Sequence, residues 1–304
     1  MTILLAGRFD WNKLDLKNVI DDLNIIICND EDEDEMDVNP AEVDAIVCNW
    51  YFKYHDIHRY ENLKYIQLLS TGYNGIDPEE VKGMGIELHN AKGIYSVPMA
   101  EFVVGNILLF YKRYCCFVQQ KSSHDWKKKR DIEEILDKKI LIIGTGDVGT
   151  ETAKRLRGFT DYLYGCNRTV KDIDYFDKIY LMTDLPEILP EMDIIVTCVA
   201  LTPDTKNLLD YEMFSKMKRS VLVVNVSRGE VINEKDIIFA LENNMIGGAI
   251  LDVFEEEPLS YDSKLWELDN VIITPHNSFV SNRNEERISA MIMYNLGCWV
   301  DNYG

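Results

Sequence analysis

The sequence predicts an α/β protein built from two doubly wound parallel-sheet domains. Short, continuously apolar runs alternate with polar stretches compatible with helices, first up to about residue 90 and again from Lys139 onward. Continuously apolar strands are typical of parallel sheets, because helices cover both faces of such sheets. The length of 304 residues also suits two domains of ordinary size rather than one.

Each alternation defines the strands of one predicted sheet. The first domain contains the apolar runs 3–6, 25–28, 45–48, 65–69 and 86–88. The second contains the runs 140–143, 162–166, 193–199, 221–226, 249–253 and 271–274. The acidic run from Asp30 to Asp37 could bind a cation or a basic partner, but a solvated loop is the favoured interpretation, because like charges repel one another and resist packing.

An unusually apolar segment separates the two alternations. Residues Ser96 to Phe117 are apolar on nearly every face, with Pro98 near the expected helix start. We expect this helix to be buried, either between domains or at a subunit interface. The basic run Lys127–Arg130 is interpreted as a solvated connector, and the pattern over 288–299 predicts a final helix.

Composition and charge exclude several classes of function. The chain has 32 Lys and Arg against 52 Asp and Glu, a net charge of -20. Such a surface repels phosphate backbones and anionic lipids, which argues against nucleic acid and membrane partners.

No apolar run approaches the roughly 18–20 residues of a spanning helix. The start of the chain lacks signal-peptide features, and the seven cysteines show no metal-like spacing. We therefore expect a cytoplasmic protein without a metal site.

A glycine-rich motif follows the first predicted strand of the second domain. It comprises Gly144, Thr145, Gly146, Asp147, Val148 and Gly149, and a helix-compatible run begins directly after it. The three glycines permit a tight turn, close approach of backbone to a pyrophosphate, and close packing of helix on strand. The helix N-terminus would offer free N–H groups to the phosphates. The alternative is a glycine-rich turn without a ligand.

The next strand end bears on the choice of cofactor. This fold usually places an acidic residue about 20 positions after the glycines, where it accepts hydrogen bonds from the adenosine ribose. Asn167 stands there instead, and Arg168 and Thr169 follow it. A neutral Asn does not repel a 2′-phosphate, which Arg168 and Thr169 could bind. We therefore favour NADP(H), with NAD(H) as the alternative; Arg168 could also be an ordinary solvent-facing turn residue.

Three polar residues follow strands of the second predicted sheet. Arg228 follows the run 221–226, Glu257 the run 249–253 and His276 the run 271–274. In open α/β sheets, ligands bind beyond the carboxyl ends of the strands. Each residue also has a structural interpretation: Arg228 could form a structural ion pair, Glu257 is one of three consecutive glutamates, and His276 could cap a strand end.

Together the three residues suit the reduction of a 2-keto acid. Arg228 could bind the carboxylate and carbonyl, fix their orientation and stabilise developing negative charge. His276 could deliver a proton to the carbonyl oxygen as hydride reaches the carbon. Glu257 could orient the imidazole and keep it protonated near neutral pH.

The second half of the chain resembles the D-isomer-specific 2-hydroxyacid dehydrogenase family. The resemblance rests on GTGDVG, LTPDTKNLL, NVSRGEVI, GGAILDVFEEEPL and NVIITPH, with weaker similarity in STGYNGID and PMAE. It implies that Arg228, Glu257 and His276 are catalytic. It also implies that Cys198, Val199, Ala200 and Asp252 contact the cofactor. Backbone N–H groups of Thr71 and Gly72, in the loop from Ser70 to Asn74, would bind the substrate carboxylate beside Arg228 and His276.

The resemblance further implies a flavodoxin-like substrate domain at 1–97 and 282–304 and a Rossmann cofactor domain at 98–281. A homodimer would form around the long apolar helix.

Three features depart from the family pattern. Ala200 replaces a common proline, the stretch around Lys92 differs from members with familiar substrates, and the acidic ribose partner is absent. The identity of the 2-keto acid is therefore not transferred.

Rival functions remain within and outside the enzyme class. Formate dehydrogenases of similar fold usually carry Gln at the position of Glu257, which argues against formate. A short-form phosphoglycerate dehydrogenase stays open. Some relatives are nucleotide-sensing corepressors, but the intact trio of Arg228, Glu257 and His276 favours an enzyme.

Overall fold

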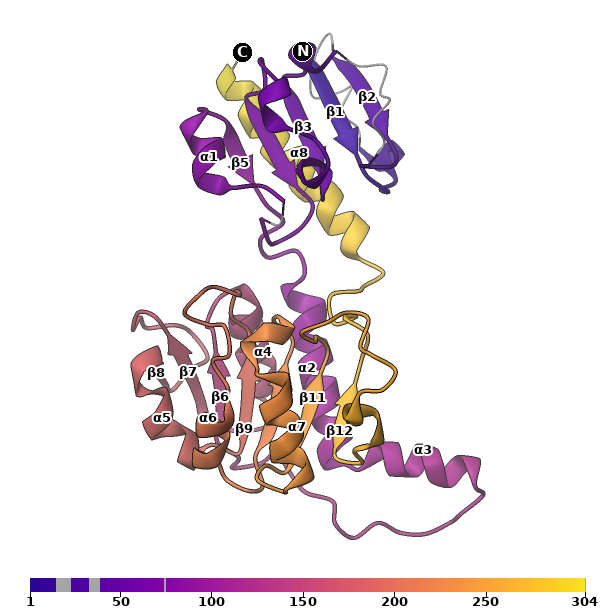
Figure 1. The fold of residues 1–304 in the computed structure, drawn as a ribbon, viewed down its shortest axis with the longest axis vertical. Coiled ribbons are helices and arrows are strands. Elements are labelled where there is room, and N and C mark those ends of the chain that lie inside the picture. The colour runs from indigo at the N-terminus through magenta and orange to yellow at the C-terminus, as the bar shows by residue number, and fades with distance from the viewer. Residues whose placement is uncertain (15–22, 33–38, 74, 304) are drawn as a thin grey trace. The chain divides into compact units, whose positions relative to one another are not determined.

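The computed structural model describes residues 1–14, 23–32, 39–73 and 75–303, and it divides into two compact units. Unit 1 comprises Met1–Tyr95 and Ser281–Gly304, and unit 2 comprises Ser96–Val280 (Figure 1). Each unit contains one parallel sheet, as the sequence predicts. Residues 33–37 of the acidic run lie outside the described residues, so the interpretation of that run stays a prediction.

The sheet of unit 1 has five parallel strands in the order β2-β1-β3-β4-β5, which is the flavodoxin-like order. The strands are β1 (Thr2–Ala6), β2 (Asn24–Cys28), β3 (Ala45–Cys48), β4 (Tyr65–Leu68) and β5 (Glu87–His89). Short helices in this unit are η1 (Trp11–Lys13), η3 (Pro40–Glu42), η4 (Tyr51–Lys53), η5 (Ile57–Arg59) and α1 (Pro78–Gly83). The predicted strands are confirmed to within about two residues at each end.

Apolar side chains cover both faces of this sheet. The C-terminal helix α8 (Asn284–Tyr303) packs Ile292, Leu296 and Trp299 against one face. The ring of Trp299 is 1% exposed, and its centroid lies 5.1 Å from that of Tyr65 on β4. Helix α8 therefore belongs to the core of the N-terminal unit, although some 190 residues of sequence separate them.

The sheet of unit 2 has seven parallel strands in the order β12-β11-β10-β9-β6-β7-β8. They are β6 (Ile140–Ile143), β7 (Leu163–Asn167), β8 (Lys178–Leu181), β9 (Ile194–Thr197), β10 (Leu222–Asn225), β11 (Gly248–Leu251) and β12 (Val271–Ile273). Read from β8, the order is that of a Rossmann fold with one added strand. The sequence prediction missed β8, because this edge strand buries only Ile179 and lacks a continuous apolar run.

Helices cover the two faces of this sheet. They are α2 (Ser96–Tyr111), α4 (Asp147–Leu156), α5 (Leu185–Ile188), α6 (Tyr211–Lys216) and α7 (Glu234–Glu242), with short η6 (Met182–Asp184), η7 (Leu189–Glu191), η8 (Gly229–Val231) and η9 (Lys264–Glu267). The same unit also contains α3 (Tyr114–Ser122). Residues of α2 and α4 pack on Ile140 and Ile142, whereas α5, α6 and α7 pack on Leu141 and Ile143. Side chains of alternate strand residues therefore point to opposite faces of the sheet and belong to two separate hydrophobic cores.

The prediction of one buried helix from Ser96 to Phe117 is wrong beyond Tyr111. Arg113 adopts a left-handed φ of 53°, which ends α2 and starts α3 in a new direction. Helix α3 buries none of its residues, whereas α2 buries eight. The basic run Lys127–Arg130 is exposed, as predicted for a solvated connector.

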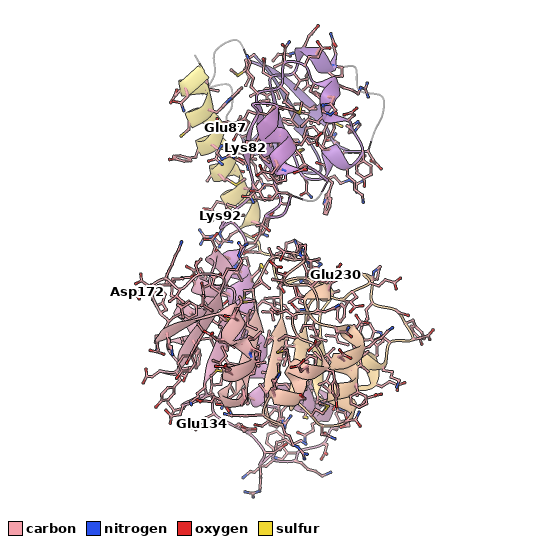
Figure 2. The ribbon with its side chains drawn as sticks, turned by 60° about the vertical axis from the view of Figure 1, so that its left-hand side comes forward. Lys82, Glu87, Lys92, Glu134, Asp172 and Glu230 are labelled. Atoms are coloured by element: carbon pink, nitrogen blue, oxygen red, sulfur yellow. The ribbon has the colours of Figure 1, made fainter. Side chains whose placement is uncertain are left out.

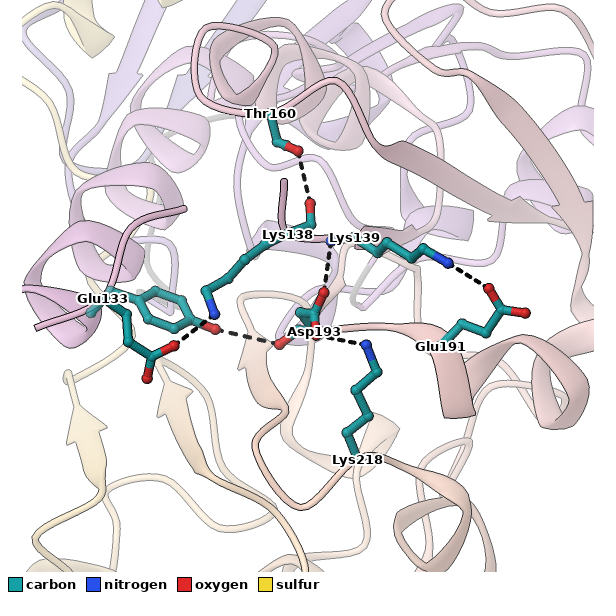
Figure 3. Close-up of polar contacts among 8 residues, drawn as sticks. Glu133, Lys138, Lys139, Thr160, Glu191, Asp193 and Lys218 are labelled. Atoms are coloured by element: carbon teal, nitrogen blue, oxygen red, sulfur yellow. Dashed lines mark hydrogen bonds and ion pairs between the residues drawn. The ribbon is translucent and has the colours of Figure 1, made fainter. Parts of the chain in front are cut away.

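A polar cluster joins residues 133–139, which follow this connector, to the amino ends of the strands of unit 2 (Figure 3). The carboxylate of Asp193 accepts a hydrogen bond from the backbone N–H of Lys139 at 2.9 Å and from Nζ of Lys218 at 2.7 Å. Lys138 pairs with Glu133 at 2.7 Å, and Thr160 Oγ1 donates to the Lys138 carbonyl at 2.8 Å. These bonds fix the chain just before it enters β6.

None of the helices in the described part of the chain is long and apolar enough to span a membrane. Among the same residues, no three His, Cys, Asp or Glu side chains are grouped as metal ligands would be.

Candidate active site

The candidate residues of unit 2 gather at the carboxyl edge of its sheet. The glycine motif follows β6, Asn167 ends β7 and Cys198 follows β9, whereas Arg228, Glu257 and His276 follow the neighbouring strands β10, β11 and β12. Figure 2 shows Glu230, two residues after Arg228, at the opposite end of this unit from Glu134, which lies shortly before β6. The strands β6 and β9 are adjacent although they are distant in sequence, which makes their edge a topological switch point.

The glycine motif forms the turn between β6 and α4. Gly144 has a φ of 94°, and a Cβ there would lie 2.5 Å from the Cys198 carbonyl oxygen. A Cβ on Gly149 would lie 2.0 Å from the Gly144 carbonyl oxygen. A Cβ on Gly146 would meet nothing within 4 Å, so this glycine leaves open space at the N-terminus of α4. The turn thus combines tight packing with an open cradle whose free N–H groups suit a phosphate.

Asn167 is tied to the glycine motif. Its Nδ2 donates to Thr145 Oγ1 at 2.7 Å, and its Oδ1 accepts from the backbone N–H of Arg168 at 2.8 Å. The side chains of Arg168 and Thr169 lie in solvent. The amide of Asn167 therefore holds the turn that presents Arg168 at the end of β7.

The turn after β9 is held by a threonine that sequence reasoning did not select. Thr205 Oγ1 donates to the Ala200 carbonyl at 2.7 Å and accepts from the backbone N–H of Thr202 at 2.8 Å. Cys198 and Val199 are partly buried beside this turn, and Ala200 is exposed. A hydroxyl within the sequence TPDT was the only local signal of this fixed turn.

Glu257 and His276 form a direct pair. Nδ1 of His276 donates to Oε2 of Glu257 at 2.7 Å, and Glu257 Oε1 accepts from the backbone N–H of Phe254 at 3.1 Å. The rings of Phe279 and His276 pack edge to face, with their centroids 5.8 Å apart. Both side chains remain more than a third exposed. Among the described residues, none is hydrogen-bonded to Nε2 of His276, which is therefore open to a reacting group.

Asp252 anchors the loop that carries His276. Its carboxylate is fully buried and accepts from Thr274 Oγ1 at 2.7 Å and from the N–H groups of Asn277 and Ser278 at 2.8 and 2.9 Å. Its carbonyl accepts from the His276 N–H at 2.8 Å. These bonds hold His276 at a φ of 50°, an uncommon backbone angle for a non-glycine residue. The cofactor contact suggested for Asp252 stays a prediction.

Arg228 is half-buried at the start of η8. Its Nη1 donates to the Ser227 carbonyl at 2.7 Å. No carboxylate within the described ranges forms an ion pair with Arg228, so its charge is available to an anionic ligand. The structural ion pair considered as an alternative is thus absent from the described part of the chain.

Gly229 brings the Arg228 loop against the Glu257 loop. A Cβ on Gly229 would lie 1.8 Å from the Phe254 carbonyl carbon and 2.4 Å from the Glu255 nitrogen. Only glycine allows this contact between the two backbones. Packing thereby links the Arg228 loop to the loop of Glu257, which is bonded in turn to His276.

Thr71 and Gly72 lie in unit 1, directly after β4. The Thr71 carbonyl accepts from Asn90 Nδ2 at 2.7 Å, and the Gly72 carbonyl accepts from Ser70 Oγ at 2.8 Å. No acceptor among the described residues is bonded to the N–H of Thr71 or Gly72. The carbonyls are thus fixed while the two N–H groups stay available. Asn74 of the same loop lies outside the described residues.

Comparison with known proteins gives consistent matches for both units. Residues 104–278 match the family model described as D-isomer specific 2-hydroxyacid dehydrogenase, NAD binding domain. A glyoxylate reductase of Pyrococcus horikoshii is 30% identical over 295 residues, which cover 92% of this chain and 88% of that protein.

Solved structures share the fold over nearly the whole chain. A probable 2-hydroxyacid dehydrogenase of Rhizobium etli, solved in complex with NADP, has a TM-score of 0.81 and 26% identity, and the match covers 99% of this chain and 95% of that one. A D-lactate dehydrogenase of Aquifex aeolicus, complexed with NAD and lactic acid, has a TM-score of 0.81 over 98% and 96% of the chains. At 24% identity, that second likeness concerns the fold alone.

Proposed function

The chain belongs to the D-isomer specific 2-hydroxyacid dehydrogenase family and is an NAD(P)-dependent oxidoreductase, and we propose that it reduces a small 2-keto acid using Arg228, Glu257 and His276. The observation that carries this proposal is the 2.7 Å bond between Glu257 and His276, which leaves Nε2 of the imidazole open. Arg228, which has no carboxylate partner among the described residues, lies on the loop after β10, next to the strand that precedes Glu257.

Arg228 binds and orients the substrate in this proposal. Its planar guanidinium can donate parallel hydrogen bonds to the carboxylate and to the carbonyl oxygen of a 2-keto acid. The same donors then stabilise the negative charge that develops on that oxygen. The Nη1 bond to Ser227 restricts the guanidinium before substrate arrives, which reduces the entropy lost on binding.

His276 transfers the proton. The carboxylate of Glu257 accepts the Nδ1 hydrogen, so the proton delivered to the carbonyl oxygen comes from Nε2. Loss of that proton leaves a neutral imidazole that still carries hydrogen at Nδ1. The buried Asp252 keeps the ring in place by holding the backbone on both sides of His276.

The residues around the glycine motif fit a nicotinamide dinucleotide. The open cradle at Gly146 and the N-terminus of α4 would hold the pyrophosphate, with Thr145, Asp147, Val148 and the Cys198–Ala200 turn nearby in the fold. When bound, the reduced nicotinamide supplies the hydride that the substrate carbon accepts. We favour NADPH over NADH, because Asn167 carries no charge to repel a 2′-phosphate and Arg168 is exposed beside it.

Unit 1 supplies the second contact to the substrate carboxylate in this proposal. Thr71 and Gly72 present adjacent N–H groups in a loop whose carbonyls are already bonded. Two such donors suit a carboxylate, and neither selects for the rest of the substrate. Glyoxylate, the compound for which the reductase of Pyrococcus horikoshii is named, is therefore the first to assay.

A second copy of the chain is the proposed partner of α2 and α3. Helix α3 buries no residue, and Leu109, Tyr114, Val118 and Trp126 expose 36%, 54%, 54% and 100% of their surface. The basic run after α3 would also meet an acidic surface on a second copy, because the net charge is -20. Light scattering of the purified protein should give a mass near 70 kDa, twice the 35.2 kDa of one chain; a monomer mass would contradict the homodimer.

One assay tests the reaction directly. Loss of absorbance at 340 nm is followed with NADPH and with NADH against glyoxylate, hydroxypyruvate, pyruvate, branched and aromatic keto acids, and phosphohydroxypyruvate. We expect turnover of at least one small keto acid, loss of that turnover in His276→Ala, and strong impairment in Arg228→Lys. Normal turnover in His276→Ala would refute the mechanism. Inactivity of the parent protein with every compound would favour nucleotide sensing instead.

A further inference from the structure

We propose that Asn225 is the positioning residue that sets the Arg228 guanidinium for the substrate. Asn225 ends β10 and is 1% exposed, and it pairs in register with Thr197 at the end of β9 and with Leu251 at the end of β11. Its side chain is therefore fixed in the centre of the strand ends. The proposal rests on the proposed function in assigning Arg228 to the substrate.

The amide of Asn225 uses both of its polar atoms on the turn that carries Arg228. Oδ1 accepts from the backbone N–H of Ser227 at 3.1 Å and from Ser227 Oγ at 2.8 Å, while Nδ2 donates to the Arg228 carbonyl at 3.0 Å. The dipeptide Ser227–Arg228 is thus held at its first N–H and its last carbonyl. No other side-chain type of this length offers an acceptor and a donor on one rigid plane.

A buried hydroxyl orients this amide. Thr197 Oγ1 donates to Asn225 Oδ1 at 2.8 Å, and Ser227 Oγ lies 3.3 Å from the same hydroxyl. Thr197 is fully buried and Ser227 is 6% exposed. Because an unsatisfied buried polar group is costly, this network strongly favours one orientation of the Asn225 side chain.

The fixed dipeptide controls the charged group through one further bond. The Ser227 carbonyl points toward the guanidinium and accepts from Arg228 Nη1 at 2.7 Å. Rotation of the Ser227–Arg228 peptide would redirect this carbonyl and release the guanidinium. Asn225 therefore acts on substrate binding through the backbone, without touching the substrate itself.

Steady-state kinetics of two variants test this role. Asn225→Ala removes the whole amide, and we expect about a 100-fold fall in kcat/KM for the keto acid, because small misplacements of a reacting group have effects of this size. Thr197→Val removes only the orienting hydroxyl and should cause a smaller loss, about fivefold. The matched control is Thr160→Val, which loses a buried hydroxyl bond at the other end of the sheet and should keep normal kinetics.

The form of the loss separates positioning from general damage. Mispositioned Arg228 raises KM for the keto acid and lowers kcat, while the affinity for NADPH stays unchanged. A merely destabilised protein would show a lower kcat with an unchanged KM, as fewer molecules are folded. In an Arg228→Lys background, Asn225→Ala should cost little more, because the group it positions is gone. Additive losses, or an unchanged KM in Asn225→Ala, would overturn the proposal.

A crystal structure of Asn225→Ala tests the same proposal without any turnover. We expect the Ser227–Arg228 peptide to rotate and the Nη1 bond to Ser227 to be lost. An unmoved Arg228 would contradict the positioning role even if the enzyme proves inactive on every keto acid. Conversely, a displaced Arg228 in a protein without reductase activity would refute only the proposed reaction.

Discussion

Nδ1 of His276 lies 2.7 Å from Oε2 of Glu257, and the other carboxylate oxygen of Glu257 accepts the Phe254 N–H. One side chain therefore fixes both the rotation of the imidazole and the nitrogen that carries its hydrogen toward the protein. Under the proposed mechanism, this geometry leaves Nε2 for the substrate.

Replacing Glu257 by Gln keeps the shape of this contact and removes its charge. We expect kcat for keto acid reduction to fall about a hundredfold, because a neutral amide accepts the Nδ1 hydrogen more weakly than the carboxylate does and orients the imidazole less firmly for proton transfer. Stopped-flow absorbance at 340 nm measures the reduction step. Glu256→Gln is the control, because Glu256 is the exposed neighbour of Glu257 and carries the same charge without contacting His276. Equal kcat values in Glu257→Gln and the parent protein would contradict the assigned role.

Gly229→Ala should strongly destabilise unit 2. The added Cβ would lie 1.8 Å from the Phe254 carbonyl carbon, so one of the two backbones has to move. Overpacking of this kind costs about 3 kcal/mol, or more when backbone is displaced. Urea unfolding measures the loss. In Gly158→Ala the nearest atom is 3.7 Å away, and that variant should unfold near the parent midpoint.

Arg168→Ala should change the choice of cofactor. If the exposed guanidinium binds the 2′-phosphate, its removal raises KM for NADPH about 10- to 100-fold, the range expected for a charge-assisted hydrogen bond. The KM for NADH should stay constant and serves as the internal control. A parent protein that prefers NADH, or a variant that loses both cofactors equally, would be evidence against the NADPH assignment.

Asp193 should make the folded protein less stable as the pH falls into the acid range. Burial raises the pKa of Asp193, but the Lys218 ammonium and the Lys139 N–H outweigh burial and hold that pKa below its ordinary value (Figure 3). The folded protein thus gains stability above the pKa of the unfolded state, about 3.9, and loses it as pH falls through the lower folded value.

Asp193→Asn removes this contribution. We expect the free energy of unfolding to fall by about 1–2 kcal/mol at pH 7 and to decline less steeply than in the parent protein below about pH 4. Thermal unfolding followed by circular dichroism at several pH values is the measurement. Asp174→Asn, at an exposed position of the same unit, is the control. Parallel pH curves for Asp193→Asn and the parent would rule out this linkage.

Sequence patterns predicted most of the fold because most of its strands are continuously apolar and the central strands of both sheets are buried on both faces. The patterns failed where burial is one-sided or the backbone is unusual. Strand β8 buries only Ile179, and the left-handed Arg113 that separates α2 from α3 has no local sequence signal. Strand β8 is defined by its pairing with β7 rather than by its own sequence.

Some residues of the candidate site could likewise be predicted from the sequence, and others could not. Arg228, Glu257 and His276 could be selected because each follows an apolar strand and has a chemical role. Asn225 could not, because its significance lies in bonds to Thr197 across 28 positions of sequence. The bonds from Asp252 to residues 274–278 were equally hidden, since only the fold brings these segments together.

All three residues proposed to act on the reacting carbon and oxygen belong to one unit, Ser96–Val280, and their loops contact or bond one another. Residues 1–95 contribute none of these three. Under the proposed assignment, mutations in unit 1 can change the substrate while Arg228, Glu257 and His276 remain unchanged. The arrangement makes the chain a favourable starting point for recombination, in which residues 1–95 exchanged together with helix α8, whose side chains complete their core, would redirect an existing reaction rather than build a new one.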